Sequence, residues 1–99
     1  MIRRQVIFSP EAKQDLLDIG DWIAERAGIE IALRYIDRME KFCAGLELSS
    51  ERGRRRNEVR PGLRVVGFER RIAVAFSVTS TEVIILRLHY GGRDWEAPP

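Results

Sequence analysis

The sequence predicts a small α+β domain in which a helical hairpin packs on one face of a mostly antiparallel, twisted sheet. Two segments in the first half repeat apolar residues every three or four positions, which is typical of amphipathic helices. One β-prone segment precedes them, and three follow residue 62. The predicted order is therefore β-α-α-β-β-β. A chain of 99 residues has room for one core, so we expect a single domain over residues 1–99.

The first half begins with a short β-prone segment, residues 4–8, followed by Ser9-Pro10 as a helix start. Serine caps free N–H groups, and proline costs nothing at the first helical position. The first apolar stripe ends at Gly28 and consists of Ala12, Leu16, Ile19, Ile23 and Ala27. The second consists of Ala32, Tyr35, Ile36, Met39, Phe42, Cys43 and Leu46. The short connection between them predicts an antiparallel hairpin.

The second half predicts strands over residues 63–68, 71–78 and 83–90. The turn near Glu69-Arg70 lacks an Asn-Gly pair, so we expect it to be longer than two residues or bulged. Strict alternation along the last strand sorts its residues into two sets: Ile84, Leu86 and Leu88 on one face, and Val83, Ile85, Arg87 and His89 on the other. If the first set packs under the helices, Arg87 and His89 face the open side of the sheet beside Arg64.

Positive charge is concentrated in one segment. Residues 52–71 carry eight arginines and two glutamates, net +6, whereas residues 1–51 and 72–99 have net charges of −3 and −1. Between residue 48 and the first strand of the second half, the pattern shows neither a helical nor a strand period, which predicts an exposed connection. Arginine used without lysine favours bidentate contact with carboxylates or phosphates. We expect this segment to meet an anionic partner.

Composition excludes several classes of protein. Apolar residues make up 44% and charged residues 32%, which is typical of a folded, water-soluble domain. No apolar run approaches the roughly 20 residues that span a bilayer, and no signal-like segment is evident, so we expect a cytoplasmic protein with no membrane partner. Cys43 is the only cysteine, so no intrachain disulfide is possible, and its place on an apolar stripe predicts an inert thiol. One histidine and one cysteine do not make a metal site, and we expect no cofactor.

Four segments in fixed order carry a family resemblance. They are Ser9-Pro10-Glu11-Ala12 with Asp15, Leu16 and Ile19; Gly53-Arg54 with Arg56 and Glu58; Arg60-Pro61-Gly62-Leu63-Arg64; and Ile85-Leu86-Arg87-Leu88-His89-Tyr90-Gly91-Gly92-Arg93-Asp94. In this order and spacing, almost the whole chain resembles the ParE toxins of bacterial type II toxin-antitoxin systems, within the RelE/ParE superfamily. One position departs from the pattern. Many relatives place a histidine directly before the final glycine, whereas here Tyr90 stands there and His89 comes one residue earlier.

The resemblance implies a toxin that inhibits DNA gyrase and is not an enzyme. It also implies a hetero-oligomer with a ParD-like antitoxin, whose acidic tail folds on binding. The residues expected to bind the antitoxin are Ile19, Trp22, Ile23, Arg56, Arg60, Arg64 and Arg87. Those expected to bind the target are Arg93, Asp94 and Trp95.

Two alternatives remain open from the sequence. The first is a RelE-like, metal-independent endonuclease acting on ribosome-bound mRNA, whose acid-base and phosphate-holding groups would be Arg64, Arg87, His89 and Tyr90. The absence of lysine from the second half disfavours it. The second is a nucleic-acid-binding module that uses the arginines alone, but no aromatic residues are interleaved with them. We therefore expect no sequence-specific DNA binding by this chain alone.

Overall fold

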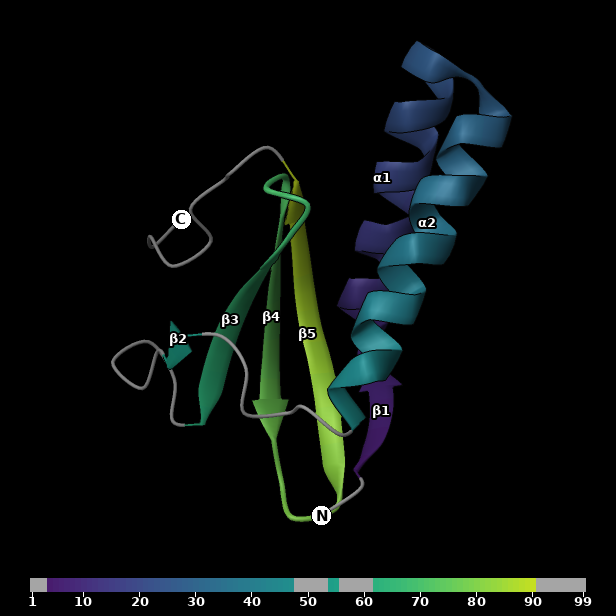
Figure 1. Cartoon of the computed structure of the whole chain (residues 1–99). Coiled ribbons are helices and arrows are strands. Elements are labelled where there is room, and N and C mark those ends of the chain that lie inside the picture. The colour runs from purple at the N-terminus through teal and green to yellow at the C-terminus, as the bar shows by residue number, and fades with distance from the viewer. Residues whose placement is uncertain (1–3, 48–53, 56–61, 91–99) are drawn as a thin grey trace.

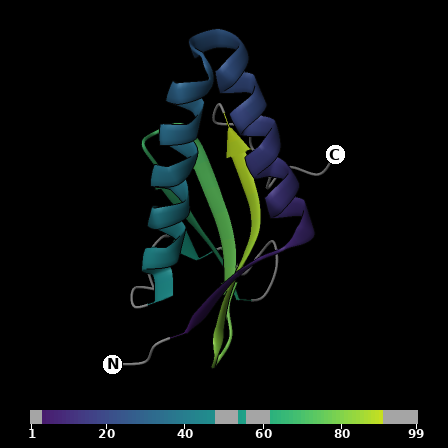
Figure 2. The ribbon, with the colours of Figure 1, turned by 90° about the vertical axis from the view of Figure 1, so that its right-hand side faces the viewer.

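The computed structural model describes residues 4–47, 54–55 and 62–90. Its elements are β1 (Gln5–Phe8), α1 (Pro10–Ala27), α2 (Ile29–Ala44), a 3₁₀ turn (Gly45–Glu47), β2 (Arg54–Arg55), β3 (Leu63–Phe68), β4 (Ile72–Val78) and β5 (Glu82–Tyr90). The strands form one sheet in the order β1-β5-β4-β3-β2, in which only the β1–β5 pair is parallel. The helical hairpin packs against one side of this sheet (Figures 1 and 2). The predicted α+β fold is confirmed.

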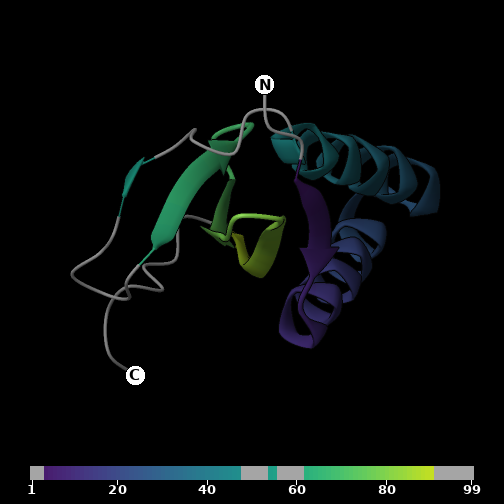
Figure 3. The ribbon, with the colours of Figure 1, turned by 90° about the horizontal axis from the view of Figure 1, so that it is seen from below.

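The helical hairpin forms for the reasons that the sequence indicates. The Ser9 hydroxyl accepts a hydrogen bond from the Ala12 N–H at 3.0 Å, and Pro10 is the first helical residue. Gly28 ends α1 with a φ of +99°, a conformation that L side chains rarely adopt. Both predicted stripes supply core residues, except that Ala27 is exposed in the last turn of α1. Seen from below, the two helices lie beside β1 and β5, while β3 extends away from them (Figure 3).

Two connections differ from a simple loop. Glu69 and Arg70 both have positive φ, 49° and 61°, and the Arg71 N–H donates to the Phe68 carbonyl at 3.1 Å. Residues 69–71 separate β3 from β4, so the predicted longer turn is confirmed. The prediction of a connection without strand was wrong at one place, since Arg54–Arg55 pairs with β3 as β2. A strand of two residues is too short to show any alternation in a sequence.

A β-bulge in β5 changes which residues face the helices. Phe76 pairs with Ile85 and Ala75 pairs with Arg87, so Leu86 is an extra residue with no partner on β4. As a result Val83, Ile85 and Leu88 all belong to the hydrophobic core. The prediction that Ile84, Leu86 and Leu88 share one face of the sheet, with Val83 and Ile85 on the other, was therefore wrong. Strict alternation fails because the extra residue switches the face from which each later side chain emerges.

The start of α1 covers the edge of β5 beyond the bulge. β1 pairs with β5 only as far as Ile85. After that point the Ser9 hydroxyl donates to the Leu86 carbonyl at 2.9 Å, and the Asp15 carboxylate accepts the Leu88 N–H at 2.9 Å. Asp15 also accepts two hydrogen bonds from Arg87, from Nε at 2.8 Å and from Nη2 at 3.1 Å. We call this set of bonds between Asp15, Arg87 and the Leu88 N–H the Asp15 clamp.

The Asp15 clamp holds an ionised carboxylate. The Asp15 side chain is only 13% exposed, and this burial by itself raises its pKa. The hydrogen bonds from Arg87 and the Leu88 N–H, together with the Arg87 charge, outweigh burial and leave the pKa of Asp15 below its ordinary 3.8. Because the pKa is lower in the folded chain, the clamp contributes stability fully at neutral pH. That contribution is lost as the pH falls below about 4.

Replacement of Asp15 is expected to destabilise the fold. Asp15→Ala leaves Arg87 and the Leu88 N–H without their acceptor, so we expect urea unfolding to show a loss of about 2–3 kcal/mol at pH 7. Asp15→Asn, which keeps one acceptor but no charge, should lose less, and its difference from the unchanged chain should shrink as the pH is lowered from 5 to about 3. Asp18→Ala, on the exposed side of the same helix, is the control. Equal stability losses at positions 15 and 18 would contradict the role given to the clamp.

Candidate functional site

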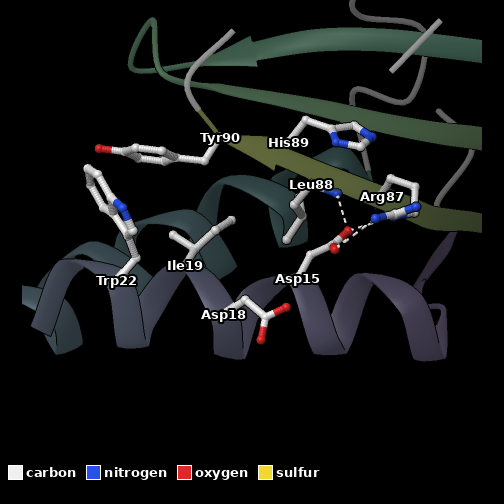
Figure 4. A pocket seen from close by; sticks show the side chains of 8 residues that line it. All are labelled: Asp15, Asp18, Ile19, Trp22, Arg87, Leu88, His89 and Tyr90. Atoms are coloured by element: carbon white, nitrogen blue, oxygen red, sulfur yellow. Dashed lines mark hydrogen bonds and ion pairs between the residues drawn. The ribbon is translucent and has the colours of Figure 1, made fainter. Parts of the chain in front are cut away.

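A groove of about 560 Å³ lies between α1 and the end of β5. It is lined by Asp15, Asp18, Ile19 and Trp22 from α1 and by Arg87, Leu88, His89 and Tyr90 from β5 (Figure 4). This volume falls within the range of sites that hold small ligands and is larger than one amino-acid side chain. The groove exists because β1 stops at Phe8, so that a helix rather than a strand flanks the last part of β5.

The floor of the groove is apolar. Ile19 and Leu88 are both buried and belong to the hydrophobic core of the domain. Asp15, Asp18 and Trp22 follow at helical spacing, so they lie along one side of α1 next to Ile19. A partner that enters the groove would therefore meet a rigid surface continuous with the core.

One end of the groove is closed by two aromatic rings. The Trp22 and Tyr90 rings are tilted against each other with centroids 4.6 Å apart, and Trp22 is 40% exposed. The Arg26 guanidinium lies 4.1 Å from the centre of the Trp22 ring, close enough for a cation–π interaction. Arg71 donates a hydrogen bond of 3.4 Å to the Tyr90 hydroxyl. Large, partly exposed aromatic side chains next to arginine are typical of protein-binding surfaces.

The other end of the groove is formed by the Asp15 clamp. The hydrogen bond and the charge of Asp15 raise the pKa of Arg87 above its ordinary value, so this arginine stays charged. Its guanidinium fork is turned toward α1 (Figure 4). Arg87 is thus already engaged by a carboxylate of its own chain.

The structure gathers some of the residues predicted to bind an antitoxin and separates others. Ile19, Trp22 and Arg87 line the groove together, whereas Ile23 is buried in the core and does not line it. Arg64 lies on β3, two strands from β5 and therefore about 10 Å across the sheet. Arg56 and Arg60, like the predicted target-binding residues Arg93, Asp94 and Trp95, lie outside the described residues.

The four residues of the ribonuclease alternative are only partly brought together. Arg87, His89 and Tyr90 line the groove, whereas Arg64 does not. His89 extends from β5 on the side away from α1 (Figure 4). Arg87 and His89 pair with Ala75 and Ala73 of β4, so both lie on the face of the sheet opposite the core residue Phe76, as predicted. Arg64 pairs with Phe76 itself and therefore lies on the other face, so the predicted arrangement of all three on one open face is not found.

Sequence reasoning missed two features of the surface. Asp15 and Asp18 look like solvated helix residues, and only the pairing of α1 with β5 reveals their place in the groove. Ile29, Ile31 and Leu33 are 50–63% exposed at the tip of the hairpin. Ile29 and Leu33 are four positions apart on α2 and lie on one side of it, whereas Ile31 lies on another side. Their positions outside the predicted apolar stripe were the available signal. Exposed aliphatic residues on different sides of a helix do not by themselves mark an interface.

The described residues include few groups suited to metal or thiol chemistry. Among residues 4–47, 54–55 and 62–90 there is no group of three side chains that could hold a metal ion. Burial raises the pKa of the Cys43 thiol to about 12, in agreement with the predicted inert thiol. None of the helices in this part of the chain is long and apolar enough to span a bilayer.

Comparison with known proteins places the chain in a family. The model of the ParE toxin of the type II toxin-antitoxin system parDE matches residues 6–95. No curated protein matches the chain. The match includes both helices, all of β1 except Gln5, the other described strands and every residue that lines the groove.

Two solved structures have a similar fold. The chromosomal ParDE toxin-antitoxin system from Pseudomonas aeruginosa contains a chain with a TM-score of 0.77 and 26% identity, over 89% of this chain and 96% of that one. The toxin-antitoxin complex RelBE2 from Mycobacterium tuberculosis contains a chain with a TM-score of 0.66 and 20% identity, over 91% of this chain and 93% of that one, a likeness of fold alone. Because the family model spans nearly the full length, this chain belongs to the ParE toxin family of type II toxin-antitoxin systems.

Proposed function

We propose that this ParE-family toxin inhibits DNA gyrase by binding, and that a ParD-like antitoxin neutralises it by occupying the groove between α1 and β5. The toxin acts in the cytoplasm, needs no cofactor and turns over no substrate. The observation that carries the proposal is the groove itself, with an apolar floor, an aromatic end and an arginine already engaged by Asp15. Such a surface suits a protein partner better than a scissile phosphate.

The groove supports antitoxin binding through three of the predicted residues. Ile19 supplies apolar floor, Trp22 supplies a half-exposed aromatic anchor, and Arg87 forms part of the wall. Ile23 is buried in the core and does not line the groove. Arg56, Arg60 and Arg64 belong to the arginine-rich segment, and we assign them to the acidic part of the antitoxin tail. The Pseudomonas structure, 26% identical, is a ParDE toxin-antitoxin system and supports a partner of this kind.

The ribonuclease alternative has weaker support. Acid-base cleavage of RNA needs two proton-transfer groups on either side of the phosphate and a cation free to stabilise the developing charge. Arg87 is held by Asp15, and Arg64 lies two strands away. A RelE-like mRNA endonuclease remains the second candidate because the Mycobacterium RelBE2 toxin-antitoxin complex shares the fold.

Purified toxin should trap gyrase. With gyrase, ATP and relaxed plasmid, we expect supercoiling to fall and linear DNA to accumulate after detergent and protease treatment, because a stalled enzyme keeps its DNA cut. Parallel translation reactions should show no codon-positioned cuts in a defined message. The opposite pattern, with normal supercoiling and cut message, would establish the ribonuclease alternative.

Antitoxin binding should depend on the aromatic end of the groove. Trp22→Ala is expected to weaken binding of the ParD-like antitoxin encoded beside the toxin by about 30-fold or more, as for a buried aromatic anchor. Isothermal titration calorimetry of the purified proteins measures this. Leu17→Ala, which removes a large exposed side chain of α1 outside the groove lining, is the control and should bind normally. Unchanged affinity for Trp22→Ala would place the antitoxin on another surface.

Gyrase trapping should depend on the segment that follows β5. We propose Arg93, Asp94 and Trp95 as target-binding residues, and we expect their triple replacement by alanine to reduce trapped gyrase–DNA complexes by about tenfold or more. Antitoxin affinity, measured on the same preparation, should be retained, which separates loss of target binding from misfolding. Full trapping by the triple variant would remove these residues from the target-binding surface.

A further inference from the structure

The groove has opposite charges at its two ends. Asp15, Asp18, Trp22 and Arg26 lie along one side of α1, over a length of about 16 Å. Asp18 and the Asp15–Arg87 pair occupy the end nearer the helix start. Arg26 and Arg71 lie beside the aromatic pair at the end nearer the hairpin tip. Between them lies the apolar floor of Ile19 and Leu88, which are both buried.

At the acidic end, Asp18 is the carboxylate available to a partner. Asp15 is engaged by two hydrogen bonds from Arg87 and one from the Leu88 N–H. Asp18 is exposed and accepts one hydrogen bond, 2.9 Å long, from the uncharged Gln14 amide. No cation pairs with Asp18 within the described part of the chain. A positively charged side chain in the groove would therefore find a carboxylate whose charge is not neutralised.

At the aromatic end, two arginines offer the opposite charge. Arg26 stacks on Trp22 and donates to the Trp22 carbonyl, and its nearest carboxylate is Glu25 at 4.0 Å, with both side chains largely exposed. Arg71 donates to the Tyr90 hydroxyl and forms no ion pair with any carboxylate in the described part of the chain. Both guanidinium groups therefore retain donors for an acidic side chain beside the aromatic pair.

From this arrangement we infer that the antitoxin segment in the groove carries a basic residue, then one or more apolar residues, then an acidic residue, along the direction from the start of α1 to the hairpin tip. The basic residue pairs with Asp18, the apolar residues pack on Ile19, Leu88 and Trp22, and the acidic residue meets Arg26 and Arg71. This inference rests on the proposed antitoxin binding and adds the orientation of the bound segment. The inference also excludes a uniformly acidic segment as the occupant of the groove, because Asp18 would repel it.

Matched charge reversals test the inference. In titrations of the full-length toxin with the full-length ParD-like antitoxin, we expect Asp18→Lys to weaken binding about five- to thirty-fold. Asp21→Lys changes net charge equally on the same helix but lies outside the groove, and should change affinity about twofold or less. Arg26→Glu should likewise weaken binding more than Arg34→Glu, an exposed arginine on α2. Circular dichroism of each variant establishes that it is folded.

A compensating change in the antitoxin gives the sharper result. Each basic residue of the antitoxin tail is changed in turn to glutamate. One of these antitoxin variants should bind the Asp18→Lys toxin more tightly than it binds the unchanged toxin. The Asp21→Lys toxin should show no such gain in affinity. Equal effects within each matched pair, or tighter binding by Asp18→Lys, would overturn the inferred order of charges. If Trp22→Ala also leaves affinity unchanged, the groove is not the antitoxin site. If Trp22→Ala weakens binding while the charge pairs behave alike, only the charge order fails.

Discussion

The carboxylate of Asp15 is the contact on which both the groove and the junction between the hairpin and the sheet depend. It accepts the Leu88 N–H, which no neighbouring strand reaches because β1 ends at Phe8, and it neutralises Arg87 on the same strand. An unsatisfied N–H at this half-buried position would cost about as much as a lost hydrogen bond. One side chain on α1 therefore joins the hairpin to the sheet, completes the edge of β5 and forms the wall of the groove.

The elements of the fold follow from local chemistry, and a single sequence reveals them. Ser9-Pro10 starts α1, and Gly28 ends it with a positive φ. Two apolar stripes at helical spacing pack the helices against the sheet. These signals act over a few residues. A cap, a turn or an amphipathic face is therefore decided before any distant contact forms. The limits of β1, β3, β4 and β5 agree with the predicted ones to within one residue, whereas the two-residue strand β2 was not predicted.

The groove could not be predicted in the same way, because it arises from contacts between residues about 70 positions apart. The extra residue Leu86 becomes a bulge only where β5 passes from β1 to α1, and no local pattern marks that point. Strict alternation therefore assigned Leu88 to its observed face but gave Val83 and Ile85 the wrong one. Asp15 was visible as part of a family-like motif, yet its partners Arg87 and Leu88 emerge only from the packed structure.

The ion pair between Asp15 and Arg87 limits the chemistry that this groove can carry out. Fold alone does not determine activity, and what a basic cleft can do depends on which of its cations are free. An arginine at position 87 could stabilise the charge that develops on a phosphate only if its guanidinium group were not already held by a carboxylate. While Asp15 holds its guanidinium group, Arg87 cannot stabilise a phosphate in this way. Opening the Asp15 clamp would release Arg87, but it would also expose the edge of β5 at the Leu88 N–H. The groove is thereby left with an apolar floor and aromatic anchors, which are features suited to holding a protein segment.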